Sequence, residues 1–362
     1  PCPQREITSN RTITSEMAGH SRRKTLAAIV SAASLMKGVG VLALGRALAG
    51  STKNAKHCIK RVWRFLRNAD VEVEAISAGL FQYLRPPTGR TIILVDWTDL
   101  GPFQQLVFSL PRNGRALPFL SLTIRKGTSA QAQEGAMIEA EQRGLEMLSR
   151  MMPPSLQPII VSDRGFGNTR WMADIQKRGW HWVQRLSHIH TINLSEHLGT
   201  LKELGIRRGW HARDWGWGTL DEKEWGPVRL VTVFERNAKE AWYLVTDLEY
   251  EPPAEIVRIY KRRMWIEAMF RDLKNRNWGL GLDNVRLSEP VRHDRHFIIL
   301  ALAYVFLVAF GAAAETFGIA RMLQANTSQE RVLALARVGN YFIQLADCDL
   351  DVALQTLAAL PT

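Results

Sequence analysis

The sequence predicts an α/β protein with helical regions at both ends, and three observations support this. The first 85 residues have helical character, with breaks at Gly38, Gly40 and Gly50. Between residues 91 and 186, short β-branched runs alternate with helical segments in the order three strands, helix, strand, helix, strand. After Pro290 no further strand pattern is found, so the rest of the chain is predicted to be helical. This order is compatible with several α/β folds.

In the N-terminal region, Ser51 is suited to cap a helix that runs to about Asn68. Five cations recur on one face of this helix, at relative positions 0, 3, 7, 11 and 14, and apolar side chains form the opposite face. The pattern is typical of a helix that docks on a core and presents its cations to DNA phosphates. A solvated amphipathic helix is the alternative. The five cations are Lys53, Lys56, Lys60, Arg64 and Arg67.

The middle of the chain contains the strand patterns. RPPTG at 85–89 is a plausible linker, and 187–250 is longer than one helix and one strand require, so an inserted β subdomain is expected there. Strands are expected at 91–97, 103–110, 117–123, 158–162 and 180–186, with helices near 130–150 and 168–179. The predicted divisions are 1–85 (helical, DNA-binding), 86–186 (core), 187–250 (β insert), 251–290 (core, with a helix that carries Glu267) and 291–362 (C-terminal helices).

Charge and cysteine content narrow the class of protein. The chain has 362 residues and a net charge of +12, and the first 90 residues hold 15 Lys and Arg against five acids. This excess favours a polyanionic partner such as nucleic acid. Three distant cysteines cannot form an even disulfide framework, which indicates a reducing cytosol. The sequence contains no GxxxxGK[ST] loop, so consumption of ATP is not expected.

One apolar segment, Phe297 to Ala314, is 18 residues long and uncharged, the lower limit for a membrane span. It is the only such segment, it is rich in small residues, and further helix is expected after it. We therefore predict a buried core helix and no membrane association.

Two carboxylates follow buried strand patterns. Asp96 comes after the apolar run 92–95, and Asp163 comes soon after 159–161. An acid at the end of a buried strand lies where the sheet edge opens into a cleft. A plain turn or cap residue is the alternative for each of them.

A third carboxylate lies in the segment YKRRMWIEAMFRDLK, residues 260–274. On one continuous helix, Tyr260, Arg263, Glu267 and Lys274 would share a narrow face, joined by Arg271. Seen alone, this could be a salt-bridged surface helix. Together with the two strand-end aspartates, Glu267 could hold one or two Mg²⁺ ions, which prefer carboxylate oxygens and support in-line phosphoryl transfer.

These residues resemble a known family. Asp96, Asp163 and Glu267 are similar to the acidic triad of the DDE transposases, and the spacing of Tyr260, Arg263, Glu267 and Lys274 matches the Y-(2)-R-(3)-E-(6)-K signature of the insertion-sequence-four family. DWTDL, VSDRGF, GLGL at 279–282 and LQANT at 323–327 resemble its insertion-sequence-ten branch. One departure is that Met264 follows the signature Arg, where many relatives carry an aromatic residue, and the Trp stands at 265.

The resemblance implies a ribonuclease-H-like catalytic core and a bacterial cut-and-paste transposase. Such enzymes nick the transposon end, form a hairpin with the freed 3′-hydroxyl, reopen it and join the end to target DNA. The implied cofactor is Mg²⁺, two ions bound by the three acids, with Mn²⁺ as a substitute. Arg263, Lys274 and Arg271 would hold phosphates, Tyr260 would hydrogen-bond one of them, and Trp242 would stack on a displaced base, although most Trp residues of the insert are expected in its core.

The implied partners are double-stranded DNA, both the terminal inverted repeats and the target, and a second copy of the chain in the DNA complex. The implied location is the bacterial cytoplasm, at the nucleoid. Two alternatives remain: a domesticated sequence-specific DNA-binding protein without catalysis, and a ribonuclease-H-like nuclease without strand transfer.

Overall fold

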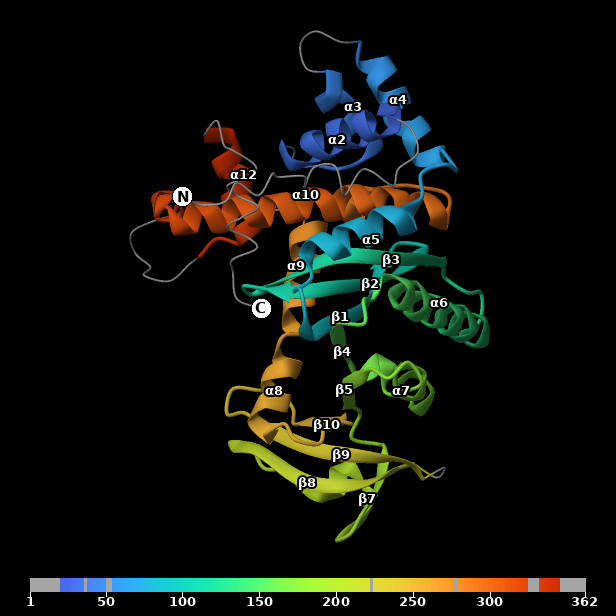
Figure 1. The fold of residues 1–362 in the computed structure, drawn as a ribbon, viewed down its shortest axis with the longest axis vertical. Helices are drawn as coiled ribbons and strands as arrows, with labels where there is room; N and C mark the ends of the chain where they lie inside the picture. The colour runs from blue at the N-terminus through green and yellow to red at the C-terminus, as the bar shows by residue number, and fades with distance from the viewer. Residues whose placement is uncertain are drawn as a thin grey trace.

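The computed structural model describes residues 20–35, 38–49, 54–221, 224–275, 279–324 and 332–345. Four helices form the N-terminal region: α2 (His20–Leu35), α3 (Val41–Ala49), α4 (Ala55–Arg67) and α5 (Val73–Leu84). The first three lie at one end of the molecule, on the long helix α10 (Pro290–Thr316), and α5 lies between α10 and the sheet (Figure 1).

Helix α4 begins later than the sequence predicted. Asn54 is its N-cap, and the side-chain oxygen of Asn54 accepts a hydrogen bond from the backbone N–H of Lys56 at 3.0 Å, so the predicted cap at Ser51 is wrong. Ser51 and Lys53 lie outside the described residues. The predicted separation of faces is confirmed, because Cys58, Val62, Phe65 and Leu66 are buried while the stripe's described cations are exposed: Lys56, Lys60, Arg64 and Arg67.

A single mixed sheet of ten strands runs through the molecule, in the order β3-β2-β1-β4-β5-β10-β9-β8-β6-β7. Strands β1, β4 and β5 are parallel to one another, and the remaining pairs are antiparallel. The strands are β1 (Gly89–Leu100), β2 (Phe103–Arg112), β3 (Arg115–Arg125), β4 (Leu156–Ser162), β5 (His181–Leu186), β6 (Thr191–Leu194), β7 (His197–Thr200), β8 (Trp210–Leu220), β9 (Trp225–Phe234) and β10 (Trp242–Thr246).

The strands expected in the insert, β6 to β10, continue the central sheet, because β10 pairs with β5 from Tyr243↔Leu186 to Thr246↔Val183. They form the lower part of the molecule in Figure 1. The short 3₁₀ helices are η1 (Arg164–Phe166), η2 (Leu201–Leu204) and η3 (Leu282–Asn284).

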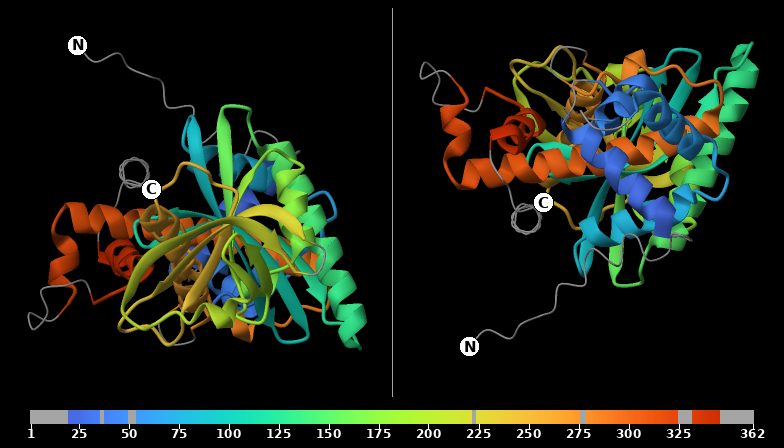
Figure 2. Two further views of the ribbon diagram at one scale, coloured as in Figure 1. Left: turned by 90° about the horizontal axis from the view of Figure 1, so that it is seen from below. Right: turned by 90° about the horizontal axis from the view of Figure 1, so that it is seen from above.

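Helices α6 (Ala130–Met151) and α7 (Thr169–Gln176) lie together beside the sheet (Figure 1). Seen from above, α6 runs along the side of the molecule opposite the C-terminal helices α11 (Ile319–Met322) and α12 (Leu335–Leu345) (Figure 2). The sheet and its helices share one continuous apolar core with the N-terminal helices.

Helix α10 is long and apolar enough to cross a membrane by length and composition, but 94% of its apolar window is buried inside the protein. It supports the N-terminal helices directly. The ring Nε2 of His296 lies 2.7 Å from the carbonyl oxygen of Val39, and Arg295 donates to the carbonyl oxygen of Leu66 at 3.0 Å. The segment is therefore the core helix that the sequence predicted.

The prediction of one continuous helix from Tyr260 to Lys274 is wrong. Helix α8 (Pro253–Lys261) ends before Arg263, and α9 (Met264–Lys274) begins after it. Across the junction the bonds span three residues, with the N–H of Arg263 donating to Tyr260 O at 2.9 Å and that of Ile266 to Arg263 O at 3.0 Å. Bonds of this kind tighten the turn and change the direction of the chain.

Candidate active site

The sheet register places Asp96 beside Asp163. The parallel pairing of β1 and β4 runs from Gly89↔Leu156 to Val95↔Ser162, and each aspartate is the next residue along the chain after the last pair. Adjacent strands lie about 4.8 Å apart, so the two carboxylates start from neighbouring backbone positions. Asp163 follows the end of β4, as predicted. Asp96 does not end its strand, because β1 continues to Leu100 by pairing with β2.

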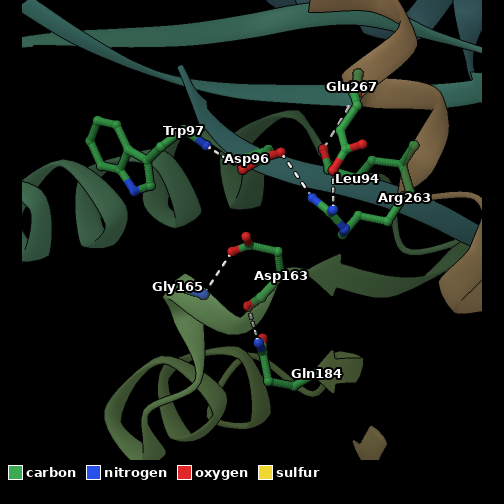
Figure 3. Close-up of polar contacts among 9 residues, drawn as sticks. Leu94, Asp96, Trp97, Asp163, Gly165, Gln184, Arg263 and Glu267 are labelled. Carbon is green, nitrogen blue, oxygen red and sulfur yellow. Dashed lines mark hydrogen bonds and ion pairs between the residues drawn. The ribbon is translucent and has the colours of Figure 1, made fainter. Parts of the chain in front are cut away.

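Local hydrogen bonds hold both aspartates. The backbone N–H of Trp97 donates to Oδ1 of Asp96 at 2.8 Å. Asp163 caps η1, where its Oδ1 accepts from the N–H of Gly165 at 2.8 Å, and its backbone carbonyl accepts from Gln184 on β5. The orientation of each carboxylate is therefore fixed by the backbone around it (Figure 3).

Arg263, the residue before α9, and Glu267 in the first turn of α9 form an ion pair next to Asp96. Nη1 of Arg263 lies 3.2 Å from Oδ2 of Asp96, and Nη2 of Arg263 is bonded to Oε1 of Glu267. Figure 3 shows the guanidinium between these two carboxylates, with Asp163 below Asp96 in the view. The side chain of Arg263 is 8% exposed, whereas that of Glu267 is 46% exposed. One buried cation therefore lies between Asp96 and Glu267, and the charge of Asp163 acts on Asp96.

The electrostatics of this group depend on burial and on the excess of acids. The pKa of Asp96 is raised to about 7, mainly by burial and also by the nearby charges of Asp163 and Glu267. Arg263 and the N–H of Trp97 act in the opposite direction without cancelling the effect. For Arg263, burial lowers the pKa, but Tyr260 and the surrounding acids outweigh this, and its pKa is raised. A further positive charge would stabilise the ionised carboxylates.

Tyr260 is fully buried and does not lie on a solvated face. Burial raises its pKa to about 12. Its hydroxyl has no hydrogen-bond partner among the described residues, and the same is true of Nε of Arg263. The ring of Trp242 meets that of Tyr260 edge-on, with the centroids 5.0 Å apart, and Trp242 is partly buried. Two polar atoms next to the acids are therefore left for a ligand.

The other predicted cations lie further along α9. Nζ of Lys274 donates to the carbonyl oxygen of Asp99 at 2.7 Å and lies 3.8 Å from Oδ1 of Asp283. Arg271 is exposed on α9. Lys56, Lys60, Arg64 and Arg67 lie on α4, in the N-terminal helical region rather than among the three acids.

One residue next to the acids was not found from the sequence. Ser162 pairs with Gln184, so Arg185 on β5 stands beside Asp163 in the register, and its charge acts on Tyr260. Arg185 forms an ion pair with Glu240, in which Nη2 lies 2.6 Å from Oε1. The available signal was an Arg inside the otherwise largely apolar strand HWVQRL.

The family model described as "Transposase DDE domain" matches residues 124–306, half of the chain, from the end of β3 into α10. The chain belongs to this family. No curated protein matches the chain. The matched range includes Asp163 and Glu267 and begins after Asp96. The protein is therefore a DDE-type transposase, an enzyme of metal-dependent phosphoryl transfer that acts on DNA.

A divalent cation such as Mg²⁺ requires oxygen donors that lie close together. Among the described residues, no group of three or more His, Cys, Asp or Glu side chains is close enough to hold a metal ion. The donor chemistry nevertheless fits, because three carboxylates adjoin and Asp96 lacks sufficient positive charge around it. The guanidinium of Arg263 contacts both Asp96 and Glu267.

Proposed function

We propose that this transposase excises a transposon by nicking, hairpin formation and hairpin opening, and then joins the 3′ ends to target DNA. Asp96, Asp163 and Glu267 are the proposed catalytic residues and metal ligands, with Mg²⁺ as the ion and Mn²⁺ as its substitute. The observation that carries the proposal is that Arg263 contacts both Asp96 and Glu267, while Asp163 lies next to Asp96 in the sheet register. The resemblance to hairpin-forming relatives supports the hairpin step.

Bound metal would supply charge neutralisation at the attacking and leaving oxygens. The remaining tasks belong to the chain itself. Glu267 must release Arg263 before its carboxylate can act as a ligand, because Oε1 is engaged by that guanidinium. Arg263 and the hydroxyl of Tyr260 would then bind one DNA phosphate together. The phosphate would supply the hydrogen-bond partner that Nε of Arg263 and the hydroxyl both lack.

The other predicted DNA contacts extend this assignment. Lys274 and Arg271, which lie on α9 after Glu267, would hold phosphates further from the scissile bond. Trp242, which already packs against Tyr260, would stack on a base displaced when the hairpin bends. The exposed cations of α4 would hold the transposon end, and two copies of the chain would act together on the paired ends.

The proposed fold and location follow from the same family. Strands β1 to β5, with α6 and α7, would form the ribonuclease-H-like core, and the strands after β5 would be its insertion. The enzyme would act in the bacterial cytoplasm, on the DNA of the nucleoid.

The test uses a labelled duplex that carries the end of the element encoding this chain, incubated with Mg²⁺. The wild-type protein should produce nicks and hairpins and should join the 3′ end to a plasmid. Glu267→Gln keeps the size of the side chain and should bind the duplex without cutting it. Cleavage that survives this change would refute the assignment of Glu267. Binding without cleavage by the wild type would indicate a domesticated binding protein, and nicks without joining would indicate a simple nuclease.

A further inference from the structure

The start of β8 and the end of β9 carry a group of exposed arginines that pack on aromatic rings. The guanidinium carbon of Arg213 lies 4.1 Å from the ring centroid of Trp215 and 5.7 Å from that of Trp210. That of Arg208 lies 5.3 Å from the centroid of Phe234. Arg207, Arg208, Arg213 and Arg236, with Trp210, Trp215 and Phe234, are called the arginine–aromatic patch below.

The patch is a concentration of uncompensated positive charge. Its four arginines are exposed, and none of them forms an ion pair within the part of the chain that the structure describes. The nearby acids are engaged elsewhere, Asp214 with Arg229 at 2.5 Å and Glu235 with Lys261. Arg229 is the contrasting case in the same hairpin, because it is buried and also donates to the carbonyl oxygens of residues 248, 249 and 251.

Stacking prepares these arginines to bind an anion. A guanidinium that lies on an aromatic ring is held in place by cation–π attraction and packing, while its N–H groups at the edge stay free. Trp215 is itself fixed, because its Nε1 donates to Oγ1 of the buried Thr232 at 2.9 Å. The entropy cost of ordering Arg213 on a ligand is correspondingly small.

The patch lies on the same sheet as Asp96, several strands away from it. Leu186 pairs with Tyr243, Tyr243 with Thr232, and Thr232 with Arg213, which makes a row across β5, β10, β9 and β8. Strands lie about 4.8 Å apart, so Arg213 starts about 10 Å from β10, two strands away. Trp242, the residue before Tyr243 in β10, contacts Tyr260 beside the acids and projects from the opposite face of the strand.

We propose that the arginine–aromatic patch binds the sugar–phosphate backbone of the DNA duplex whose other part enters the catalytic site. The inference rests on the proposed function, because it takes Asp96, Asp163 and Glu267 as the point where the duplex is cut. Charge complementarity selects the occupant. Four exposed cations, two of them held on aromatic rings, match successive phosphates, whereas aromatic rings alone would not require an anion. The patch fixes the position of the DNA and reads no sequence.

The experiment measures binding of a fluorescent 30-bp duplex of random sequence at several salt concentrations, in EDTA so that no cleavage occurs. The test variant combines Arg208→Ala, Arg213→Ala and Arg236→Ala. The control removes the same charge from exposed positions on α6 and after α7, through Arg143→Ala, Arg150→Ala and Lys177→Ala. A second test variant with Gln at the three patch positions keeps more of the packing, and thermal melting of every variant checks that it is folded.

Each lost phosphate contact should lower the slope of log K against log salt by about 0.9, so the test variants should lose about 2.7 from the slope. Their affinity at ~100 mM salt should fall at least tenfold, while the control should keep the wild-type slope. A slope and affinity equal to those of the wild type in the folded patch variants would overturn this inference and leave the proposed catalytic role untouched. Failure of the wild type to cleave its end duplex would count against the proposed function, with the difference in slope still standing.

Discussion

Replacing Asp96 by Asn should make the metal-free protein more stable at neutral pH while abolishing DNA cleavage. Asn keeps the shape of the neutral acid and retains an oxygen for the N–H of Trp97. It removes a negative charge that the folded protein accommodates poorly, because Asp96 is buried beside Asp163 and Glu267. We therefore expect that Asp96, which is proposed to be required for cleavage, lowers the free energy of unfolding of the metal-free protein.

The magnitude follows from the pKa of Asp96, which is raised from 3.8 to about 7 on folding. A folded pKa above the unfolded one means that the folded state binds the proton more tightly, so stability is lost as the pH rises from 3.8 to 7. One pKa unit corresponds to about 1.4 kcal/mol, so the wild type should lose about 4 kcal/mol by pH 8 and less than about 2 kcal/mol by pH 5. Asp96→Asn should recover most of this at pH 8 and little at pH 4.

The assay is urea denaturation in EDTA at pH 4, 5 and 8, with cleavage of the end duplex measured separately in Mg²⁺. Asp294→Asn is the matched comparison, because burial also raises the pKa of Asp294 to about 7 and this residue on α10 accepts from Thr123 at 2.7 Å, away from the three acids. Both variants should gain stability at pH 8, and only Asp96→Asn should lose cleavage. Equal gains for Asp96→Asn at pH 4 and pH 8, or a loss of stability at pH 8, would refute the electrostatic reasoning.

Three further outcomes are expected. Tyr260→Phe removes a buried hydroxyl that has no hydrogen-bond partner, so unfolding measurements should show unchanged or slightly greater stability. DNA cleavage should fall, because the proposed phosphate contact is lost. Unchanged cleavage would exclude that contact. Lys60→Ala with Arg64→Ala should alter stability by less than about 0.5 kcal/mol each but lower the salt slope of DNA binding by about two, and an unaltered slope would make the α4 stripe a solvated face. Gly339→Ala would place a Cβ 1.9 Å from the carbonyl oxygen of Leu307, so urea denaturation should show that the free energy of unfolding falls by about 1–3 kcal/mol. An unchanged free energy of unfolding would mean that α10 and α12 separate readily.

The sequence predicted the order of strands and helices well, because the buried strands have continuous apolar runs. The run at 92–95 locates β1, and the run at 159–161 locates β4, so both aspartates were found. The extension of β1 to Leu100 was missed, because Asp96 and Asp99 interrupt the apolar pattern while pairing with β2 continues through them. The alternation of apolar and polar residues that predicts a half-exposed strand is harder to recognise when acids occupy its polar positions.

The break between α8 and α9 was also missed, and the reason is periodicity. The residues from Tyr260 to Lys274 keep a helical spacing without Gly or Pro, so the local sequence contains no signal for the turn at Arg263. Tertiary contacts decide this position, where Tyr260 packs on Trp242 while Arg263 reaches Asp96. Arg185 was not predicted as a site residue for a similar reason. Its position beside Asp163 depends on the pairing of β4 with β5, which the pattern of a single strand does not specify.

The hydrogen bonds from α10 to Val39 and Leu66 have a consequence for how this transposase can evolve and be engineered. The helices proposed to hold DNA are fastened to a segment near the other end of the chain, and their apolar residues belong to the same core as the sheet. An N-terminal region transplanted from a relative should therefore fold poorly unless its matching α10 is transplanted with it. New DNA preferences would then be acquired more readily by changing exposed side chains on α4 than by exchanging whole modules.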